Sequence, residues 1–265
     1  MNSIIKYFGG KNSMFKNIIE HFPAKGSYNT YIEPFGGSFG IGFHIPEDMI
    51  APIEIYNDLE QNVYSLFKVL SDKEKYERFK SLCDISTYNE IMREEFKEKL
   101  KDSSIDDVTR AFYFFYVNRT SFNGIGAFAP IQLVRRKMSK SVSDYLSAVE
   151  RLPEIHQRLS KVIIANQDAL KLMQRYDTEN VFIYADPPYV QSTRGCTRYD
   201  IDMTDEQHMK FIDICCKAKA KILISGYDNN MYDCLCDNGF QKITFDVNVD
   251  KQKKNIRTEV LWKNY

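Results

Sequence analysis

The sequence predicts an α/β fold with a parallel sheet and a mainly helical insertion, and three observations lead to this prediction. Five short apolar runs rich in β-branched residues have the length and character of buried parallel strands. Helical patterns lie between several of these runs, for example at residues 206–219, and such alternation is typical of layered α/β proteins. A long charged stretch separates the first two runs from the last three.

The strands are expected where the apolar runs lie. These runs occupy residues 30–32, 53–56, 162–164, 181–184 and 222–224. Near the C-terminus, residues 240–249 and 257–263 alternate apolar and polar side chains. This alternation predicts an antiparallel hairpin that closes one edge of the sheet, with a basic tip at residues 250–255.

The middle of the chain predicts a separate, inserted domain. Three stretches there are charged, basic or helical in pattern: residues 71–101, 118–140 and 142–159. We read the last of these as a single helix. We therefore expect an α/β domain of residues 1–70 and 161–265, interrupted by a mainly helical domain of residues 71–160. One continuous domain with long helices is the alternative.

Composition and charge leave the class of partner open. The 265 residues are 43% hydrophobic and 27% charged, as in globular proteins, and 36 basic and 36 acidic residues give zero formal net charge. A nucleic-acid partner would need basic residues gathered on one face. The N-terminus has no long apolar run, so we expect no signal peptide, no membrane contact and a cytoplasmic location. The six cysteines lack the paired spacing of a zinc site, so no metal is expected.

Acidic residues follow four of the five expected strands. They are Glu33, Asp58, Asp168 and Asp186, whereas the fifth strand is followed by Ser225-Gly226-Tyr227. Open α/β sheets bind ligands beyond the carboxyl ends of their strands. These side chains are therefore expected to line one polar rim.

The turn Pro34-Phe35-Gly36-Gly37 indicates which ligand the rim holds. Dinucleotide enzymes carry G-x-G-x-x-G at such a turn, and this fingerprint is absent. Glu33 beside the turn would repel a phosphate, and an acidic residue at the position of Asp58 binds ribose hydroxyls. These features together favour S-adenosylmethionine, an adenosyl ligand without phosphates. A plain tight turn is the alternative for the two glycines alone.

The strongest motif is Asp186-Pro187-Pro188-Tyr189. Two prolines directly after a strand make the backbone rigid and remove two donors, which leaves carbonyl oxygens and a carboxylate as acceptors for an amino group. Tyr189 offers a flat face on which a base can stack. Acceptors that hold the hydrogens of an exocyclic amine free its lone pair for attack on an activated methyl group, and positioning then supplies much of the rate.

At this point the chain resembles the D12-class, Dam-like DNA adenine-N6 methyltransferases, of the type found in phages and mobile elements. The matching segments span nearly the whole chain: residues 6–11 (KYFGGK), 33–37 (EPFGG), 118–124 (NRTSFNG), 186–189 (DPPY) and 257–262 (RTEVLW). The resemblance implies a Rossmann-like methyltransferase sheet, with residues 71–160 as a target-recognition domain. It also implies the cytoplasm of a bacterium or of a phage-infected host.

The resemblance implies roles for matching residues. The cofactor would be held by Tyr7, Lys11, Glu33, Pro34, Phe35, Gly36, Gly37, Asp58, Asp168 and Asp186. Within this group, Asp58 would bind the ribose and Asp168 the cofactor's adenine amino group. The catalytic residues would be Asp186, Pro187, Pro188 and Tyr189. Asp186 and the Pro187 carbonyl would bind the target amine, and Tyr189 would stack on the base.

Three departures from the family pattern stand out. Phe39 replaces a glycine that the cofactor loop often carries, and Tyr7 stands where the family often has tryptophan. Residues 125–130 differ from the basic, aromatic hairpin of the subgroup that reads GATC. The recognition sequence of that subgroup is therefore not carried over.

Double-stranded DNA is the expected partner, and the enzyme would flip its target base out of the duplex. Expected contacts are Arg119, Asn123, Arg135, Arg136, Lys137 and Lys140. Asn123 would pair with a base edge, and the basic residues would bind phosphates. The basic run could equally be the solvated start of a helix. The basic residues at 251–257 are a weaker candidate.

Several alternatives remain at this stage. One is an amino-methyltransferase acting on cytosine N4, RNA or glutamine, although related enzymes of these kinds usually carry Asn or Ser in place of Asp186. A second is a DNA-binding protein that binds the cofactor with weak catalysis, and a third is a nucleotide-dependent oxidoreductase. A cognate restriction endonuclease is a candidate partner, and we expect a monomer or a weak dimer.

Overall fold

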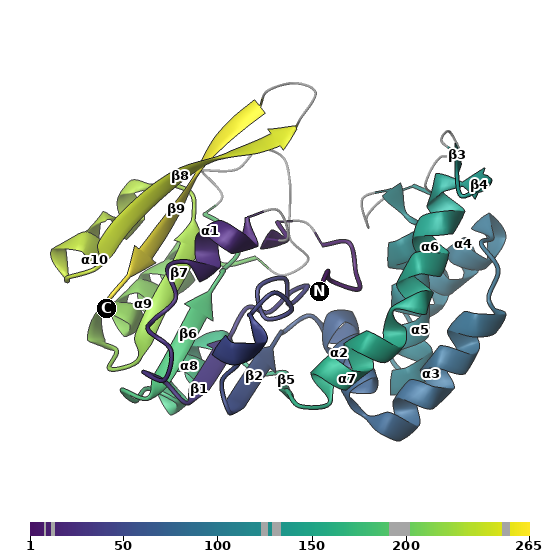
Figure 1. The fold of residues 1–265 in the computed structure, drawn as a ribbon, viewed down its shortest axis with the longest axis horizontal. Coiled ribbons are helices and arrows are strands. Elements are labelled where there is room, and N and C mark those ends of the chain that lie inside the picture. The colour runs from purple at the N-terminus through teal and green to yellow at the C-terminus, as the bar shows by residue number, and fades with distance from the viewer. Residues whose placement is uncertain (8, 12–13, 123–126, 129–133, 191–201, 251–254) are drawn as a thin grey trace. The chain divides into compact units, whose positions relative to one another are not determined.

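The computed structural model describes residues 1–265 except 8, 12–13, 123–126, 129–133, 191–201 and 251–254. Its centre is a seven-stranded sheet with the order β5-β2-β1-β6-β7-β9-β8 (Figure 1). The strands are β1 Thr30–Glu33, β2 Ile53–Asn57, β5 Ile163–Ala165, β6 Val181–Ala185, β7 Lys221–Gly226, β8 Gln241–Asp250 and β9 Asn255–Lys263.

All five predicted strands and the C-terminal hairpin are present, so the predicted α/β fold is confirmed. β1 lies parallel to both β2 and β6, and β6 lies parallel to β7. β9 pairs antiparallel with β7 and with β8, which closes this side of the sheet as expected. The lysines predicted at the hairpin tip, at positions 251, 253 and 254, lie outside the described residues.

Some of the helices pack against the sheet, and the others form a second compact unit. They are α1 Phe15–Ile19, α2 Gln61–Ser71, α3 Lys73–Ile85, α4 Glu90–Lys99, α5 Asp107–Thr120, α6 Lys140–Glu150, α7 Leu152–Leu159, α8 Ala169–Arg175, α9 Asp205–Lys217 and α10 Asp233–Asp237, with the short 3-10 turns η2 Glu47–Met49 and η5 Asn230–Tyr232. Within the described part of the chain, no helix is long and apolar enough to cross a membrane.

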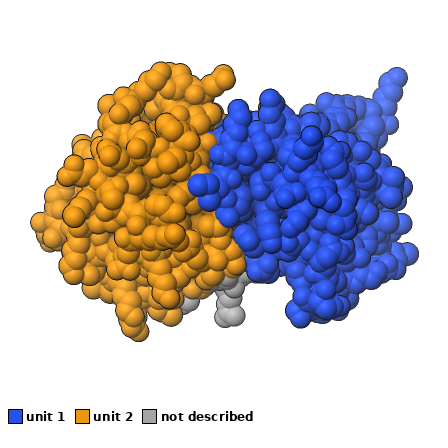
Figure 2. Space-filling model, turned by 90° about the horizontal axis from the view of Figure 1, so that it is seen from below, with its two compact units in different colours: residues 1–10, 37–43, 60–164 blue, residues 11–36, 44–59, 165–265 orange. Residues whose placement is uncertain are grey.

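The chain forms two compact units, coloured separately in Figure 2. The sheet unit contains residues 11–36, 44–59 and 165–265, and the helical unit contains residues 1–10, 37–43 and 60–164. The helical unit therefore begins before residue 71, where the sequence places the insertion, and includes two short segments from the start of the chain. Its role in target recognition stays a prediction.

The helical unit is built around α5, which packs against α2, α3, α4 and α6. Aromatic side chains fill this core, and Phe115 and Tyr116 of α5 are fully buried. The prediction of one helix over residues 142–159 was wrong, because α6 ends at Glu150 and α7 begins at Leu152. Pro153 in the first turn of α7 explains the break, since its ring tolerates a helix start but not a helix interior.

The sheet unit buries its apolar strand residues under α8 and α9. Ile32, Ile183 and Ile222 of three neighbouring strands belong to one core with residues of these helices. The helix predicted at 206–219 is α9, whose N-terminus is fixed by a capping box between Thr204 and Gln207.

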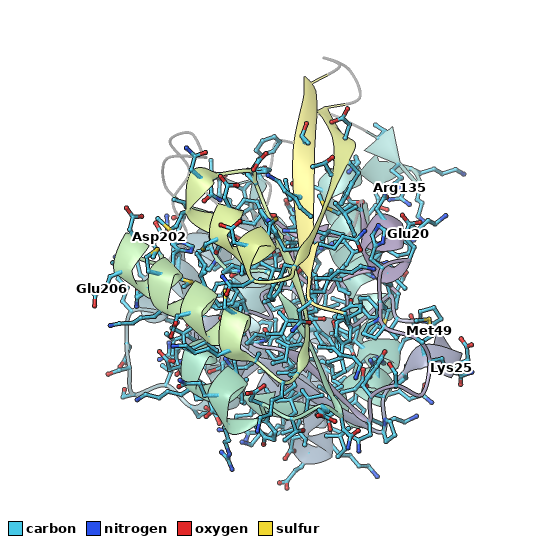
Figure 3. The ribbon with its side chains drawn as sticks, turned by 90° about the vertical axis from the view of Figure 1, so that its left-hand side faces the viewer. Glu20, Lys25, Met49, Arg135, Asp202 and Glu206 are labelled. Atoms are coloured by element: carbon cyan, nitrogen blue, oxygen red, sulfur yellow. The ribbon has the colours of Figure 1, made fainter. Side chains whose placement is uncertain are left out.

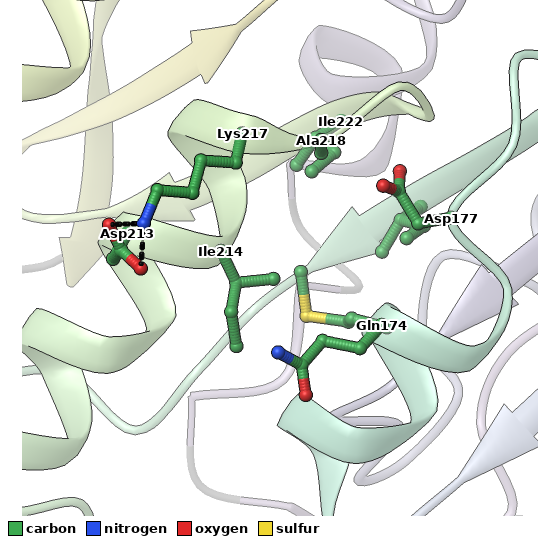
Figure 4. Close-up of a pocket in the computed structure, with 9 residues that line it drawn as sticks. Gln174, Asp177, Asp213, Ile214, Lys217, Ala218 and Ile222 are labelled. Carbon is green, nitrogen blue, oxygen red and sulfur yellow. Dashed lines mark hydrogen bonds and ion pairs between the residues drawn. The ribbon is translucent and has the colours of Figure 1, made fainter.

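A cavity of about 260 Å³ lies between α8, α9 and the sheet (Figure 4). Its lining includes Asp177 and Ala218, which follow the C-terminal ends of the two helices, and the Lys217–Asp213 ion pair at 2.7 Å closes one side. Because the helices run antiparallel to the strands, this cavity is remote from the carboxyl ends of the strands.

Phe39 shows how the chain accommodates a bulky residue where the resemblance favours glycine. Its φ of 53° lies in the left-handed region that glycine prefers. The side chain is fully buried in the helical unit, with its ring edge-on to Phe43 and Phe67 and the Arg158 guanidinium 5.8 Å away. A Cβ on Gly42 would overlap the Phe39 ring, so Gly42 leaves the space that this side chain needs.

Two substitutions of Phe39 should distinguish the contribution of its buried ring to stability from the cost of its left-handed backbone conformation. We expect Phe39→Ala to lower the free energy of unfolding by about 3 kcal/mol, because a buried aromatic ring is lost. Phe39→Gly should be less harmful by about 1 kcal/mol, because glycine adopts the left-handed backbone without strain. Urea denaturation measures both values, with Phe122→Ala at an exposed ring as the control. A glycine variant less stable than the alanine variant would contradict this account.

Candidate active site

Asp186 leaves the end of β6 with both carboxylate oxygens held. The Ser225 hydroxyl donates to Oδ1 at 2.8 Å, and the Lys11 ammonium donates to Oδ2 at 2.6 Å. The Tyr184 hydroxyl lies 2.9 Å from that of Ser225. Burial raises the pKa of Tyr184 well above its usual value, and the neighbouring Asp186 charge raises it further. Asp186 is therefore a fixed acceptor at the centre of the sheet edge.

Tyr189 closes the same loop and is also fixed. Its hydroxyl donates to Glu259 Oε2 of β9 at 2.9 Å, and both side chains are buried. The Tyr227 ring packs edge-on at a centroid distance of 4.5 Å. Lys11 Nζ lies 4.9 Å from the centroid of the Tyr189 ring. A nitrogen cation thus lies between the carboxylate of Asp186 and the aromatic face of Tyr189.

The predicted glycine turn follows β1. Glu33 is buried and accepts a hydrogen bond of 2.7 Å from the Tyr31 hydroxyl; burial and this carboxylate both raise the pKa of Tyr31. A Cβ on Gly36 would overlap the Tyr56 ring, so the turn requires glycine there. Phe35 is half-buried, with its ring edge-on to that of Phe211 at 5.9 Å.

Asn57, the last residue of β2, connects three strand ends. Its Nδ2 donates to the Pro34 carbonyl at 2.9 Å and to the Gln167 carbonyl at 3.0 Å. Its Oδ1 accepts from the Gln167 backbone N–H at 2.9 Å. The loops after β1, β2 and β5 are therefore joined by one side chain.

The two remaining acidic residues of the rim have different environments. Asp58 is 8% exposed, and its carbonyl accepts a hydrogen bond of 2.7 Å from the Asn166 side chain. Asp168 is exposed and caps α8, where Oδ1 accepts from the Lys171 N–H at 2.9 Å. Glu33, Asp58, Asp168 and Asp186 all belong to the sheet unit and follow its strands.

Tyr7 and Gly37 belong to the helical unit rather than to the sheet unit. Gly37 has a φ of 47°, and a Cβ on it would come within 2.8 Å of the Tyr7 ring. Asn118 of α5 fixes the backbone next to Tyr7, because its side chain exchanges two hydrogen bonds of 2.8 Å with the backbone of Lys6. Burial lowers the pKa of Lys6 to about 8, and the Arg119 charge adds to this effect.

The predicted DNA contacts fall into two groups. Arg135, Arg136 and Lys137 are exposed on the hairpin of β3 Val134–Arg135 and β4 Met138–Ser139, and Lys140 is the first residue of α6 (Arg135 is labelled in Figure 3). The run at 135–137 is therefore a hairpin and not the start of a helix. Arg119 is half-buried and donates to the Asp144 carbonyl at 2.9 Å. Asn123 lies outside the described residues.

Most of the exposed cations have acidic partners. Arg135 and Lys140 bind the Asp144 carboxylate at 3.0 and 2.5 Å, and Arg136 lies 3.6 Å from Glu150. Lys137 makes no ion pair with the residues that the structure describes. Among these residues there is also no cluster of three or more His, Cys, Asp or Glu side chains that could hold a metal.

Sequence reasoning assigned no role to Asn57, Ser225 or Glu259. Asn57 and Ser225 stand at the ends of expected strands, so their position was a usable signal. Glu259 belongs to the matching segment 257–262, but only the fold brings it to Tyr189, 70 residues away in the sequence.

Comparison with known proteins gives a match over nearly the whole chain. The model of the family described as D12 class N6 adenine-specific DNA methyltransferase matches residues 7–253. The chain is similar to Type II methyltransferase M.MjaIII of Methanocaldococcus jannaschii, with 27% identity over 98% of each chain. It is 25% identical to Type II methyltransferase M.CviBI of Paramecium bursaria Chlorella virus NC1A over 100% of each chain. It is 22% identical to the retron Ec67 DNA adenine methylase of Escherichia coli, over 98% of this chain and 90% of that protein.

Loss of the Asn57 side chain should destabilise the strand ends. We expect Asn57→Ala to lower the free energy of unfolding by about 2–3 kcal/mol, because one buried and two partly buried backbone groups lose their partners. Urea denaturation measures this change. Asn238→Ala, which removes an exposed bond to the Cys234 carbonyl, is the matched control and should change stability by less than about 0.5 kcal/mol. Equal effects of the two substitutions would refute a special role for Asn57.

Proposed function

Because this chain belongs to the D12 class N6 adenine-specific DNA methyltransferase family, we propose that it methylates a flipped adenine within a specific duplex sequence. The family and the enzyme class predicted from the motifs are confirmed by the match, and the alternative substrates are not favoured. The observation that best supports the proposed site is Lys11. Its ammonium lies 2.6 Å from Asp186 Oδ2 and 4.9 Å from the centroid of the Tyr189 ring, which supports a binding position there for a nitrogen with N–H donors.

We assign the cofactor to the rim of the sheet unit. Methyltransferases take their methyl group from S-adenosylmethionine, which supplies it in activated form on a positively charged sulfur. The rim fits this ligand, since its buried carboxylates suit a cation and hydroxyl donors and would repel phosphates. Asp58 is proposed to bind the ribose hydroxyls and Asp168 the adenine amino group. Glu33 would face the positively charged methionine end.

The glycine turn and the N-terminal segment complete this assignment. Pro34, Phe35, Gly36 and Gly37 are proposed to line the methionine and adenosine portions. Gly36 lets the turn pack directly against the Tyr56 ring, which fixes the path of the backbone that would line the ligand. Tyr7 and Lys11 are proposed to contact the cofactor from the N-terminal segment, so Lys11 would leave Asp186 when substrates bind.

The chemistry proposed for the loop is positioning of an amine. Asp186 Oδ2 and the Pro187 carbonyl would each accept a hydrogen bond from the adenine amine. These bonds would reduce the delocalisation of the nitrogen lone pair into the ring. Pro188 keeps the loop rigid, and Tyr189 would stack on the flipped base. Ser225 holds the other oxygen of Asp186, so the acceptor is oriented before substrate arrives.

DNA binding is proposed to use the β3–β4 hairpin. Arg135, Arg136, Lys137 and Lys140 are exposed and would contact phosphates. Half-buried Arg119, which donates to the Asp144 carbonyl of α6, stays a candidate for a further phosphate contact. Asn123 stays a candidate for reading a base edge. A paired restriction endonuclease is a further proposal, since two relatives are named Type II methyltransferases.

Expression in a bacterium without its own methylation, followed by single-molecule sequencing, tests the function directly. We expect N6-methyladenine in one recurrent sequence. Purified protein should also transfer labelled methyl groups from S-adenosylmethionine to DNA but not to RNA or protein. No transfer to any adenine-containing DNA would rule out the proposal.

Asp186→Asn should impair methyl transfer far more than cofactor binding. The substitution keeps the shape of the side chain but removes the negative charge of the group that accepts a hydrogen bond from the amine. We therefore expect methyl transfer to fall by roughly 100-fold or more. Calorimetry should show S-adenosylmethionine affinity within about threefold of the wild type. Asp213→Asn, at an exposed carboxylate of α9, is the control. Retained transfer would exclude Asp186 as the amine acceptor.

Lys137→Ala should weaken DNA binding in a salt-dependent way. Lys137 makes no ion pair in the described part of the chain, so its charge is available to a phosphate. We expect the slope of log K against log salt to fall by about 1. Fluorescence anisotropy at several salt concentrations measures this slope, with Lys217→Ala as the control. An unchanged slope would argue against a phosphate contact.

A further inference from the structure

We propose that Glu259 is a positioning residue that acts through Tyr189. Its carboxylate fixes the orientation of the Tyr189 ring and makes the ring face electron-rich. The face then stabilises the positive charge that forms on the target nitrogen during methyl transfer. This inference rests on the proposed function of the Asp186 loop and adds a residue to which that function gives no role.

The hydrogen bond between Tyr189 and Glu259 is buried and of ordinary length. The phenol donates to Oε2 at 2.9 Å, and the two residues are 8% and 5% exposed. Hydrogen bonds to a charged acceptor are roughly twice as strong as neutral ones, and exclusion of water strengthens them further. A carboxylate at the phenol oxygen pushes electron density toward the ring, which increases the negative potential of its face.

The position of Lys11 shows what this face attracts. Its Nζ lies 4.9 Å from the centroid of the Tyr189 ring and 2.6 Å from Asp186 Oδ2. A cation over an electron-rich ring is stabilised by the ring quadrupole, most strongly where water is excluded. The chain therefore places its own ammonium at the point where the target nitrogen would bind.

The reaction creates a similar charge at that point. The bond between the methyl carbon and the sulfur breaks, and its electron pair stays on sulfur. The lone pair of the adenine amine forms the new bond to carbon, so the nitrogen becomes positive until it loses a proton to solvent. A ring that stabilises this charge acts on the transition state more than on substrate binding, and therefore raises kcat.

Two neighbouring strands hold the two ends of the loop. Ser225 of β7 holds Asp186, and Glu259 of β9 holds Tyr189. β7 and β9 pair antiparallel, with Gly226 opposite Val260. Ser225 lies opposite Leu261, which is two residues from Glu259 along β9, so the alternation of side chains places Ser225 and Glu259 on the same face of the sheet.

Glu259→Gln separates charge from position. The glutamine oxygen can still accept from the Tyr189 hydroxyl, so the ring stays oriented while the negative charge is lost. The matched control is Asp246→Asn, which removes an exposed carboxylate on β8 of the same hairpin, where it accepts from Thr258. We expect Glu259→Gln to slow single-turnover methyl transfer about tenfold, the size of a desolvated cation–π contact, with KM changed less than about threefold. Asp246→Asn should leave both unchanged.

A second readout does not depend on activity. A duplex with 2-aminopurine in place of the mapped target adenine should give the same fluorescence increase with Glu259→Gln as with wild type, because flipping and stacking persist. The proposal is overturned if the variant transfers methyl groups within twofold of the wild-type rate. It is also overturned if KM rises and fluorescence falls by the same factor as the rate, which indicates a merely structural role.

Tyr189→Phe provides the independent variant if Glu259→Gln fails to fold. It keeps the ring and removes the hydroxyl, so a similar loss of rate is expected, and a wild-type rate would overturn the proposal. The double variant should be no slower than Tyr189→Phe alone, because Glu259 acts only through the hydroxyl. If the double variant were slowed by the product of the two single effects, Glu259 would not act through the Tyr189 hydroxyl. Failure of the proposed function looks different, since wild-type protein would then methylate no DNA.

Discussion

The side-chain amide of Asn57 is the interaction on which the geometry of the rim depends. Parallel strands bring their carboxyl ends to one edge, but each end leads into a separate loop with its own unpaired backbone groups. Asn57 donates to two carbonyls and accepts from one N–H, and so joins the loops that follow β1, β2 and β5. A carboxylate could not donate these bonds and an apolar side chain could make none of them. The loops that carry Glu33, Asp58 and Asp168 are therefore joined by a neutral group that adds no charge.

The loop after β6 is held in a different way, which follows from its composition. Two successive prolines remove the backbone donors that would tie the loop to its neighbours. Side chains take over this task, and Ser225 and Glu259 fix its first and last residues. Lys11 holds the loop as well, through a buried ammonium that lies against Asp186 and the Tyr189 ring. Three side chains from outside the loop thus replace the backbone hydrogen bonds that its prolines cannot make.

The strands, the hairpin and the acidic rim could be predicted because each follows from a local pattern. Short apolar runs predicted β1, β2, β5, β6 and β7, and alternation predicted β8 and β9. Pro153 also indicates the break between α6 and α7, but the helical periodicity on both sides of it led to the prediction of a single helix. Glu259 and Asn118 had no such signal. Their partners lie 70 and 112 residues away, and only strand register and helix packing bring them together.

The chain has zero net charge, so binding of DNA would depend on local groups of cations, and the strained β3–β4 hairpin carries such a group. Arg136 and Lys137 form its two-residue turn with φ values of 52° and 61°, a conformation that Asn-Gly sequences adopt far more easily. Each such residue costs roughly 1–2 kcal/mol relative to an ordinary backbone. Packing does not explain the choice, since both side chains are exposed. Arg136 contacts Glu150 and Ser147, but such exposed contacts contribute little to stability. The tight turn places two cations at its tip, and strained backbone of this kind gathers at binding sites. The conformation therefore favours a phosphate-binding role for the hairpin over a merely solvated surface.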